Sequence, residues 1–112
     1  MPSNSQKGAY YKGRAKKWLE ARGYQVADLE KVYWIRGQIP VKRDQFGADL
    51  LAVSPERIAF VQVKGGRQAA GGGQFPDARR EFDRYRFPAG PIVRKLVLAF
   101  APGSREPRVL EM

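Results

Sequence analysis

The chain has 112 residues, which is enough for one globular domain with a buried core, and 43% of them are hydrophobic. It contains 21 Lys and Arg residues against 11 Asp and Glu residues, so its net charge of +10 favours a polyanionic partner such as nucleic acid. The alternative is a basic surface that serves only solubility. Because Cys and His are absent, zinc–thiolate sites, thiol nucleophiles, disulfides and His-based acid–base catalysis are excluded.

The N-terminal part of the sequence predicts a flexible tail and one helix. Residues 1–6 are polar and expected to be flexible, and they lack the apolar centre of a signal peptide. No apolar run approaches the ~18 residues of a transmembrane helix, so a cytoplasmic protein without a membrane partner is expected. A helix is predicted over Lys7–Arg22, and Gly23 suits the position after its end. Its apolar stripe at helical spacing consists of Tyr11, Ala15, Trp18 and Leu19.

The middle of the chain predicts strands, first a short one over Tyr24–Ala27 and then a strand or hairpin within Asp28–Arg43. The most informative stretch follows, as a β-hairpin over residues 48–54 and 57–64. Its turn is Ser54-Pro55-Glu56-Arg57, with residue types typical of a type I turn. Counting back from this turn pairs Leu51 with Phe60 and Asp49 with Gln62. Both faces of the hairpin are apolar, so it should lie centrally in a sheet covered by helices on two sides.

The C-terminal half predicts a loop, a basic helix and two strands. Residues 65–74 include five glycines but lack the spacing of a phosphate-binding P-loop. A helix is expected over residues 76–87, with Ala78, Phe82 and Tyr85 inward and Arg79, Arg80, Arg84 and Arg86 on a basic face. Strands follow at 92–101 and 108–112. The whole chain, 1–112, is therefore predicted to be one α/β domain with a mixed central sheet.

Three polar side chains interrupt the apolar hairpin at one end. Asp49 faces Gln62, and Lys64 shares a face with Gln62 because side chains alternate along a strand. The oxygens of Asp49 and Gln62 suit Mg²⁺, and the Val63 carbonyl would be a third ligand. Lys64 would hold a water or stabilise negative charge on a phosphate, which is a workable set for phosphodiester hydrolysis without His. The alternative is a structural Asp–Lys ion pair.

These residues resemble the PD-(D/E)XK nuclease superfamily, whose hallmark is an Asp followed, after a strand and a turn, by Glu-x-Lys. Asp49 and Gln62-Val63-Lys64 match that pattern in part. Further motifs are similar to archaeal-type Holliday-junction resolvases in their order along the chain. They are Lys7-Gly8 ahead of a helix that ends at Gly23-Tyr24, Asp49-Leu50-Leu51-Ala52, the x-Val-Lys strand, the basic helix, the Pro91–Phe100 strand and the Arg108–Glu111 strand.

The resemblance implies a restriction-endonuclease-like fold: a mixed central β-sheet flanked by helices. It also implies a homodimeric, Mg²⁺-dependent endonuclease, with Mn²⁺ as an alternative metal, that makes paired nicks across four-way DNA junctions. A bacterial, archaeal or phage origin would be consistent with it. In this chain Lys12 stands where the family has a Glu in the first helix, and Gln62 replaces the Glu of Glu-x-Lys. We expect Asp44 to supply the missing acid, with Glu20 a weaker candidate.

The remaining expectations concern DNA and the competing functions. The residues expected to contact DNA are Lys7, Tyr10, Tyr11, Lys12, Arg14, Lys17, Arg67, Arg79, Arg80 and Arg84.

One alternative function is a different PD-(D/E)XK nuclease, of the repair or restriction type. Another is a junction-binding protein with a degenerate active site, which the scarcity of acids favours.

Overall fold

The computed structural model describes residues 4–29, 31–35, 39–43, 46–66 and 75–112. It contains two helices, α1 (Asn4–Glu20) and α2 (Phe75–Asp83). Its strands are β1 (Gln25–Asp28), β2 (Lys31–Ile35), β3 (Ile39–Arg43), β4 (Leu50–Val53), β5 (Ile58–Gly65), β6 (Val93–Phe100) and β7 (Arg108–Glu111). The prediction of an α/β fold with a mixed sheet is confirmed, and no helix among these residues has the length and apolar character needed to cross a membrane.

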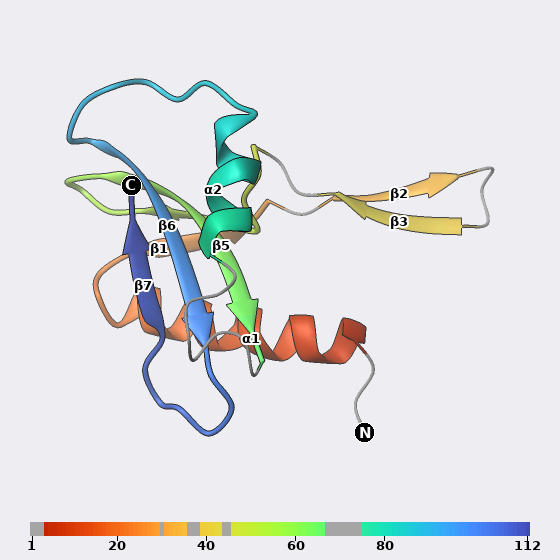
Figure 1. Cartoon of the computed structure of the whole chain (residues 1–112). Coiled ribbons are helices and arrows are strands. Elements are labelled where there is room, and N and C mark those ends of the chain that lie inside the picture. Colours follow the sequence, from red (N-terminus) through yellow and green to blue (C-terminus); the bar gives the residue numbers. More distant parts are fainter. Residues whose placement is uncertain (1–3, 30, 36–38, 44–45, 67–74) are drawn as a thin grey trace.

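The main sheet has five strands in the order β1-β4-β5-β6-β7 (Figure 1). β5 and β6 are parallel, and the other neighbours in this sheet are antiparallel. The predicted hairpin register is confirmed, since Leu51 pairs with Phe60 and the Ser54 N–H donates to the Arg57 carbonyl at 2.9 Å. The hairpin therefore occupies the second and third places of the five, with β5 at the centre.

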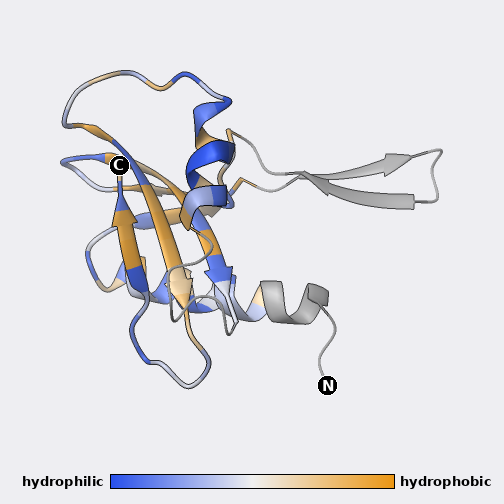
Figure 2. Ribbon diagram, viewed as in Figure 1, coloured by the Kyte–Doolittle hydropathy of each residue, from blue (hydrophilic) through white to orange (hydrophobic). Residues whose placement is uncertain are grey.

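The two helices cover opposite faces of this sheet (Figure 1). On one face Ala15 and Leu19 of α1 pack on small and branched side chains of β4, β5 and β6. On the other face Ala78 and Phe82 of α2 pack on Ala48 and Val97. Hydrophobic colour follows the central strands, and the outer side of α2 is strongly hydrophilic (Figure 2). Burial on both faces explains why β4 and the first half of β5 are apolar on both sides.

Within the part of the chain that the structure describes, strands β2 and β3 pair only with each other and form a separate two-stranded sheet. Val32 pairs with Lys42 and Trp34 with Pro40, so the hairpin expected within Asp28–Arg43 is confirmed. It extends away from the five-stranded sheet (Figure 1). The residues of the candidate functional site belong to the main sheet and α2.

α1 is longer at its start than the sequence predicted. It begins at Asn4, so residues 4–6, expected to be flexible, belong to the helix, and it ends at Glu20. Gly23 has a φ of 89°, and the Tyr24 N–H donates to the Leu19 carbonyl at 3.2 Å. That left-handed conformation costs glycine least, which confirms Gly23 as the residue that ends the helix and turns the chain into β1.

α2 is shorter than predicted: it ends at Asp83, and residues 84–87 lie outside it. The Tyr85 N–H donates to the Phe82 carbonyl at 3.0 Å, which is the tighter hydrogen bond typical of a last turn. Phe87 then packs on Phe82 and Phe60, with ring centroids 5.9 and 4.9 Å apart. A continuing helix would carry Phe87 away from Phe82, so the packing of this partly buried ring favours the end of α2. Tyr85, predicted to face inward, is 41% exposed.

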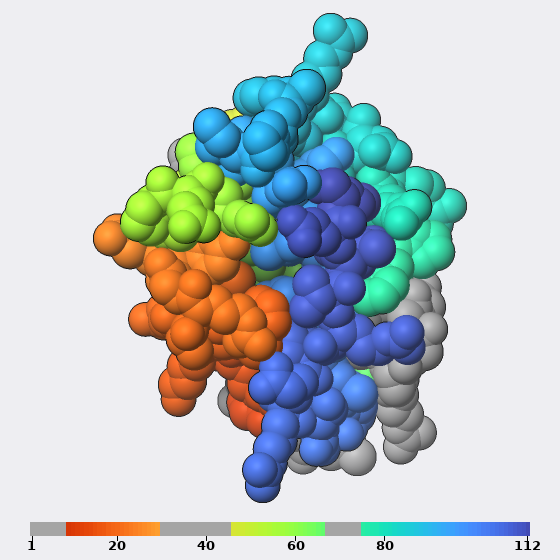
Figure 3. Space-filling view, turned by 90° about the vertical axis from the view of Figure 1, so that its left-hand side faces the viewer, coloured from red at the N-terminus to blue at the C-terminus, as the bar shows by residue number. Residues whose placement is uncertain are grey.

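The residues after α2 lead back to the start of β6 and lie beside the β4–β5 turn (Figure 3). The Ile58 N–H donates to the Ile92 carbonyl at 2.8 Å and joins the two segments. This end of the sheet is the opposite one from Lys64 and Gly65, which lie at the end of β5 and pair with Ala99 and Phe100.

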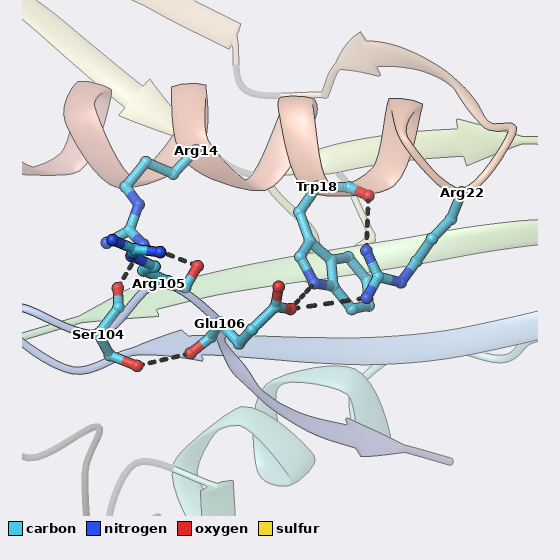
Figure 4. A network of polar contacts seen from close by, with 6 residues as sticks. All are labelled: Arg14, Trp18, Arg22, Ser104, Arg105 and Glu106. Carbon is cyan, nitrogen blue, oxygen red and sulfur yellow. Dashed lines mark hydrogen bonds and ion pairs between the residues drawn. The ribbon is translucent and has the colours of Figure 1, made fainter.

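α1 is attached to the loop between β6 and β7 by a polar network (Figure 4). The Arg14 guanidinium donates to the Ser104 and Arg105 carbonyls, and the Trp18 Nε1–H donates to Glu106 at 2.7 Å. The Arg22 guanidinium lies 3.5 Å from the centroid of the Trp18 ring and 3.6 Å from Glu106. Arg14 and Arg22 therefore stabilise the position of α1 through contacts within the protein.

Gly65, predicted to begin the glycine-rich loop, is the last residue of β5 and lies against α1. A Cβ at this position would overlap the ring of Tyr11, which stacks on Phe100 with centroids 6.2 Å apart. Because the ring is packed between β5 and β6, it cannot move aside without disturbing the core. The absence of a side chain at Gly65 is what lets α1 approach the end of β5, next to Lys64.

We expect Gly65→Ala to lower the free energy of unfolding by about 1–3 kcal/mol, the usual cost of overpacking a core. Urea unfolding would measure it. Gly13→Ala is the matched control, because Gly13 is exposed within α1 and an added Cβ there meets no atom within 4 Å. That control should stabilise the protein by roughly 0.5–1 kcal/mol, since Ala is the better helix former. A change of the free energy of unfolding in the same direction for both variants would contradict the proposed packing of Tyr11.

Candidate functional site

The segment that precedes Asp49 makes a tight turn against α2. Phe46 and Gly47 have φ values of 57° and 70°, and Ala48 behind them is fully buried. A Cβ at Gly47 would lie 3.0 Å from the Glu81 carbonyl oxygen and 3.3 Å from the Tyr85 ring. Gly47 is therefore required for both its backbone conformation and its close approach to α2. The turn places Asp49 at the start of β4, on the side of the sheet where α2 lies.

Asp49 lies at the end of the β4–β5 ladder, where hydrogen bonds to described residues of β5 and to Leu29 hold it. Its N–H donates to the Val61 carbonyl at 2.8 Å, and its carbonyl accepts from the Leu29 N–H at 2.9 Å. Its carboxylate oxygen Oδ2 accepts from the Val63 N–H at 2.7 Å. The carboxylate thus takes the place of a backbone acceptor in the ladder and is fixed beside β5. This agrees with the predicted pairing of Asp49 opposite Gln62.

Gln62 is the one buried polar side chain among the described residues, at 1% exposure. Its Nε2 donates to the Ala78 carbonyl of α2 at 3.2 Å, which fixes the orientation of the amide. Its Oε1 is also buried and accepts no hydrogen bond from any described residue. Leaving a buried amide oxygen without a donor costs about 1–3 kcal/mol, so this oxygen is well suited to a ligand.

Lys64 lies two residues further along β5, and its ammonium is 3.8 Å from the carboxylate of Glu81 on α2. Both side chains are partly exposed. Glu81 was not among the site residues predicted from the sequence. A signal for it exists, because Glu81 follows Ala78 by one helical turn and Ala78 and Phe82 are the buried residues of α2. We call Asp49, Gln62, Lys64 and Glu81 the polar cluster.

The polar cluster offers oxygen ligands of the kind that Mg²⁺ prefers. Within a β-strand the N–H and the carbonyl of one residue point to the same side, so the Val63 carbonyl is directed toward Asp49, as its N–H is. Asp49, the amide oxygen of Gln62 and this carbonyl therefore supply the types of donor atom that a hard cation takes. In the described ranges no three acidic side chains form a metal site by themselves. Asp44, the acid expected to complete the set, lies outside those ranges.

Lys12 forms an ion pair with Asp28 at the end of β1. In the nuclease family that the sequence resembles, a Glu is expected at the position of Lys12. Its ammonium lies 2.8 Å from one carboxylate oxygen of Asp28, and the Lys16 ammonium lies 2.7 Å from the other. The hydrogen bond from Lys12, and then that from Lys16, holds the pKa of the Asp28 carboxyl below its usual value. Lys12 thus has a protein partner in addition to any DNA. Glu20, the weaker candidate acid, is exposed at the last residue of α1.

The residues expected to contact DNA fall into several environments. Tyr10 and Lys17 are exposed on α1, whereas Tyr11 is half-buried beside Gly65 and Arg14 binds the β6–β7 loop. Arg79 and Arg80 are exposed on α2, where Arg80 pairs with Asp77. Arg84 is exposed, but it follows the helix and does not extend its basic face, and the same holds for Arg86. Lys7 belongs to α1, and Arg67 lies outside the described residues.

A pocket of about 290 Å³ lies at the start of β6, between residues 85–90 and Met112. None of the residues that line it belongs to the polar cluster. The polar cluster is therefore the stronger candidate for chemistry, because it combines a fixed carboxylate, an unsatisfied buried amide oxygen and an ammonium.

Comparison of the chain with protein-family models and with curated protein sequences found no match. The functional conclusion therefore rests on the residues and geometry of the polar cluster.

Proposed function

We propose that this protein is a Mg²⁺-dependent endodeoxyribonuclease of the PD-(D/E)XK type that cleaves four-way DNA junctions. The observation that carries the proposal is the meeting of Asp49, Gln62 and Lys64 on one side of the β4–β5 hairpin. Their residue types and order correspond to the Asp and the Glu-x-Lys of that superfamily. The buried, unsatisfied Oε1 of Gln62 supports a ligand-binding role over a purely structural one.

The order of elements also supports the proposal. The resemblance implies a helix, an Asp-led strand, a strand with x-Val-Lys, a basic helix, an apolar strand and a short last strand. The chain has α1, β4, β5, α2, β6 and β7 in that order, with the two helices on opposite faces of a mixed sheet. This arrangement is compatible with a restriction-endonuclease-like fold.

The residues of the polar cluster have distinct roles in the proposed reaction. Asp49 and the Gln62 Oε1, with the Val63 carbonyl, would hold the cation, because their orientations are fixed by the Val63 N–H and the Ala78 carbonyl. When bound, Mg²⁺ supplies Lewis-acid stabilisation of the phosphate and a lowered pKa of bound water. Lys64 would place its ammonium beside the phosphate that is cleaved and stabilise the negative charge that develops there.

The charge of the chain supports DNA as the partner. A net charge of +10 attracts a phosphate backbone, and exposed Lys17, Arg79 and Arg84 are available for phosphate contacts. A homodimer is part of the proposal, because two symmetric sites would produce the two nicks that resolve a junction.

The test is a comparison of DNA substrates with the full-length protein in Mg²⁺. We expect a four-way junction to be nicked at least about tenfold faster than linear duplex or a flap, a ratio that needs only ~1.4 kcal/mol of extra transition-state binding. EDTA should abolish the reaction. Equal cleavage of all three substrates would favour a repair or restriction type of nuclease.

A second candidate function is junction binding without cleavage. The ion pair of Lys12 with Asp28, at the position where an acid was expected, favours it. It predicts tight, salt-sensitive binding of the junction with no nicking in either Mg²⁺ or Mn²⁺. That outcome would replace the nuclease proposal.

A further inference from the structure

Glu81 is the acid of α2 that lies against the polar cluster from two directions. Its carboxylate is 3.8 Å from the Lys64 ammonium at the end of β5. Its backbone carbonyl lies where a side chain at Gly47 would be, two residues before Asp49. Glu81 is therefore placed between the turn that leads into Asp49 and the strand that carries Gln62 and Lys64.

The Gln62 amide is an independent sign that something binds at this place. Its Nε2 is held by the carbonyl of Ala78, one helical turn before Glu81. Oε1 is the other polar atom of the same amide, and it cannot pair with the Ala78 carbonyl because both are acceptors. It is buried and accepts no hydrogen bond from the described residues. A bound cation would give this oxygen a partner.

We propose that Glu81 is the second carboxylate of a divalent-cation site that it forms with Asp49 and the amide oxygen of Gln62. Mg²⁺ is usually bound by one or two carboxylates and keeps several of its waters, so this donor set is sufficient. The inference deepens the proposed nuclease function and depends on it for the role of the site in cleavage. It assigns an additional acid of the site to α2, a helix for which the sequence predicted an apolar stripe and a basic face.

The contact of Gln62 with Ala78 explains why the acid is on α2 and not at position 62. The Ala78 carbonyl lies within α2 and also accepts a hydrogen bond from the Gln62 amide at 3.2 Å. A carboxylate at position 62 would instead face that carbonyl with two acceptors in a buried place. An amide at position 62 and a carboxylate one helical turn beyond Ala78 avoid this conflict.

The test is calorimetric titration of the full-length protein with Mn²⁺, comparing the unchanged chain with Glu81→Gln and Asp83→Asn. Removing a residue that only supports a metal ligand typically weakens affinity 10–100-fold, so Glu81→Gln should weaken it at least about tenfold. Asp83→Asn should leave it unchanged, because Asp83 is the exposed last residue of the same helix and loses the same charge. Equal affinity for Glu81→Gln and the unchanged chain, or no Mn²⁺ binding at all, would overturn the inference.

The variant Lys64→Met tests whether Glu81 binds the cation itself or only positions Lys64. If Glu81 binds the cation, removing the competing ammonium should leave the Mn²⁺ affinity equal or raise it. If Lys64→Met weakens binding as much as Glu81→Gln does, Glu81 acts through Lys64 and the inference is wrong. Circular dichroism and urea midpoints in EDTA establish that each variant is folded.

Junction cleavage measured alongside distinguishes this inference from the proposed function. Mn²⁺ binding that depends on Glu81, without any DNA cleavage, would support the cation site and refute the nuclease. Junction cleavage by the unchanged chain, with Mn²⁺ affinity unaffected in Glu81→Gln, would support the nuclease and refute the role of Glu81.

Discussion

Asp49→Asn should reduce the rate of junction cleavage at least about 100-fold while leaving the fold and DNA binding intact. Metal assistance supplies several kcal/mol of charge stabilisation in the transition state, and each 1.36 kcal/mol corresponds to a factor of ten in rate. The Asn side chain keeps an oxygen that can accept from the Val63 N–H, now 2.7 Å from Asp49. Single-turnover cleavage in Mg²⁺, with junction binding measured in Ca²⁺, would give both quantities.

The choice of Asn over Ala matters for the interpretation of this result. Asp49→Ala would also abolish cleavage, but it would leave the Val63 N–H without the acceptor that Asp49 provides. That loss costs about 1–3 kcal/mol of stability, so a loss of activity would have two causes. Loss of one negative charge near bound phosphates should, if anything, strengthen DNA binding in Asp49→Asn. Cleavage at the unchanged rate would refute the assignment of Asp49.

Phe82→Ala should cost about 3–5 kcal/mol in the free energy of unfolding, the range for deleting a buried aromatic ring. Phe82 is 0% exposed and joins α2 to Ala48, Val97 and Phe87. Since small domains have total stabilities of about 5–15 kcal/mol, this loss is a large share of the total and should lower the urea midpoint strongly. Urea unfolding followed by circular dichroism measures the difference.

Phe46→Ala is the matched control for Phe82, because it removes the same ring from a residue that is 52% exposed. Phe46 contacts Phe60 and Tyr85 with ring centroids 5.7 and 6.2 Å apart. About half of a buried ring's stabilisation, roughly 1 kcal/mol, is expected to be lost. An equal cost for the two variants would show that α2 is not held to the sheet mainly by Phe82. Phe82→Ala should also weaken Mn²⁺ binding, because α2 positions Ala78 and Glu81.

The parts of the fold that the sequence predicted well are those set by local rules. The turn Ser54-Pro55-Glu56-Arg57 determined the hairpin register, and the pairing of Leu51 with Phe60 agrees with it. The alternation of side chains assigned Leu50 and Val61 to one face and Phe60 to the other, as found. Gly23 was recognised as the end of a helix because a left-handed residue there favours glycine.

The errors arose where a contact between distant segments overrides a local pattern. Residues 84–87 continue the helical pattern of α2, but the partly buried Phe87 packs against Phe60 of β5, and the helix stops. Gly65 belongs to a run of glycines that suggests a loop, yet it is a strand residue against which Tyr11 packs. Neither contact leaves a mark in the neighbouring sequence.

The sequence alone placed Asp49, Gln62 and Lys64 together, because a two-residue period and a turn suffice to align side chains across a hairpin. Only the tertiary structure could bring Glu81 to Lys64, the Ala78 carbonyl to Gln62 and Asp28 to Lys12. These partners are 12 or more residues apart and lie on different elements, so their meeting depends on how α1 and α2 pack on the two faces of the sheet. The hairpin thus determined which residues form the polar cluster, and helix packing determined which charges and carbonyls complete it.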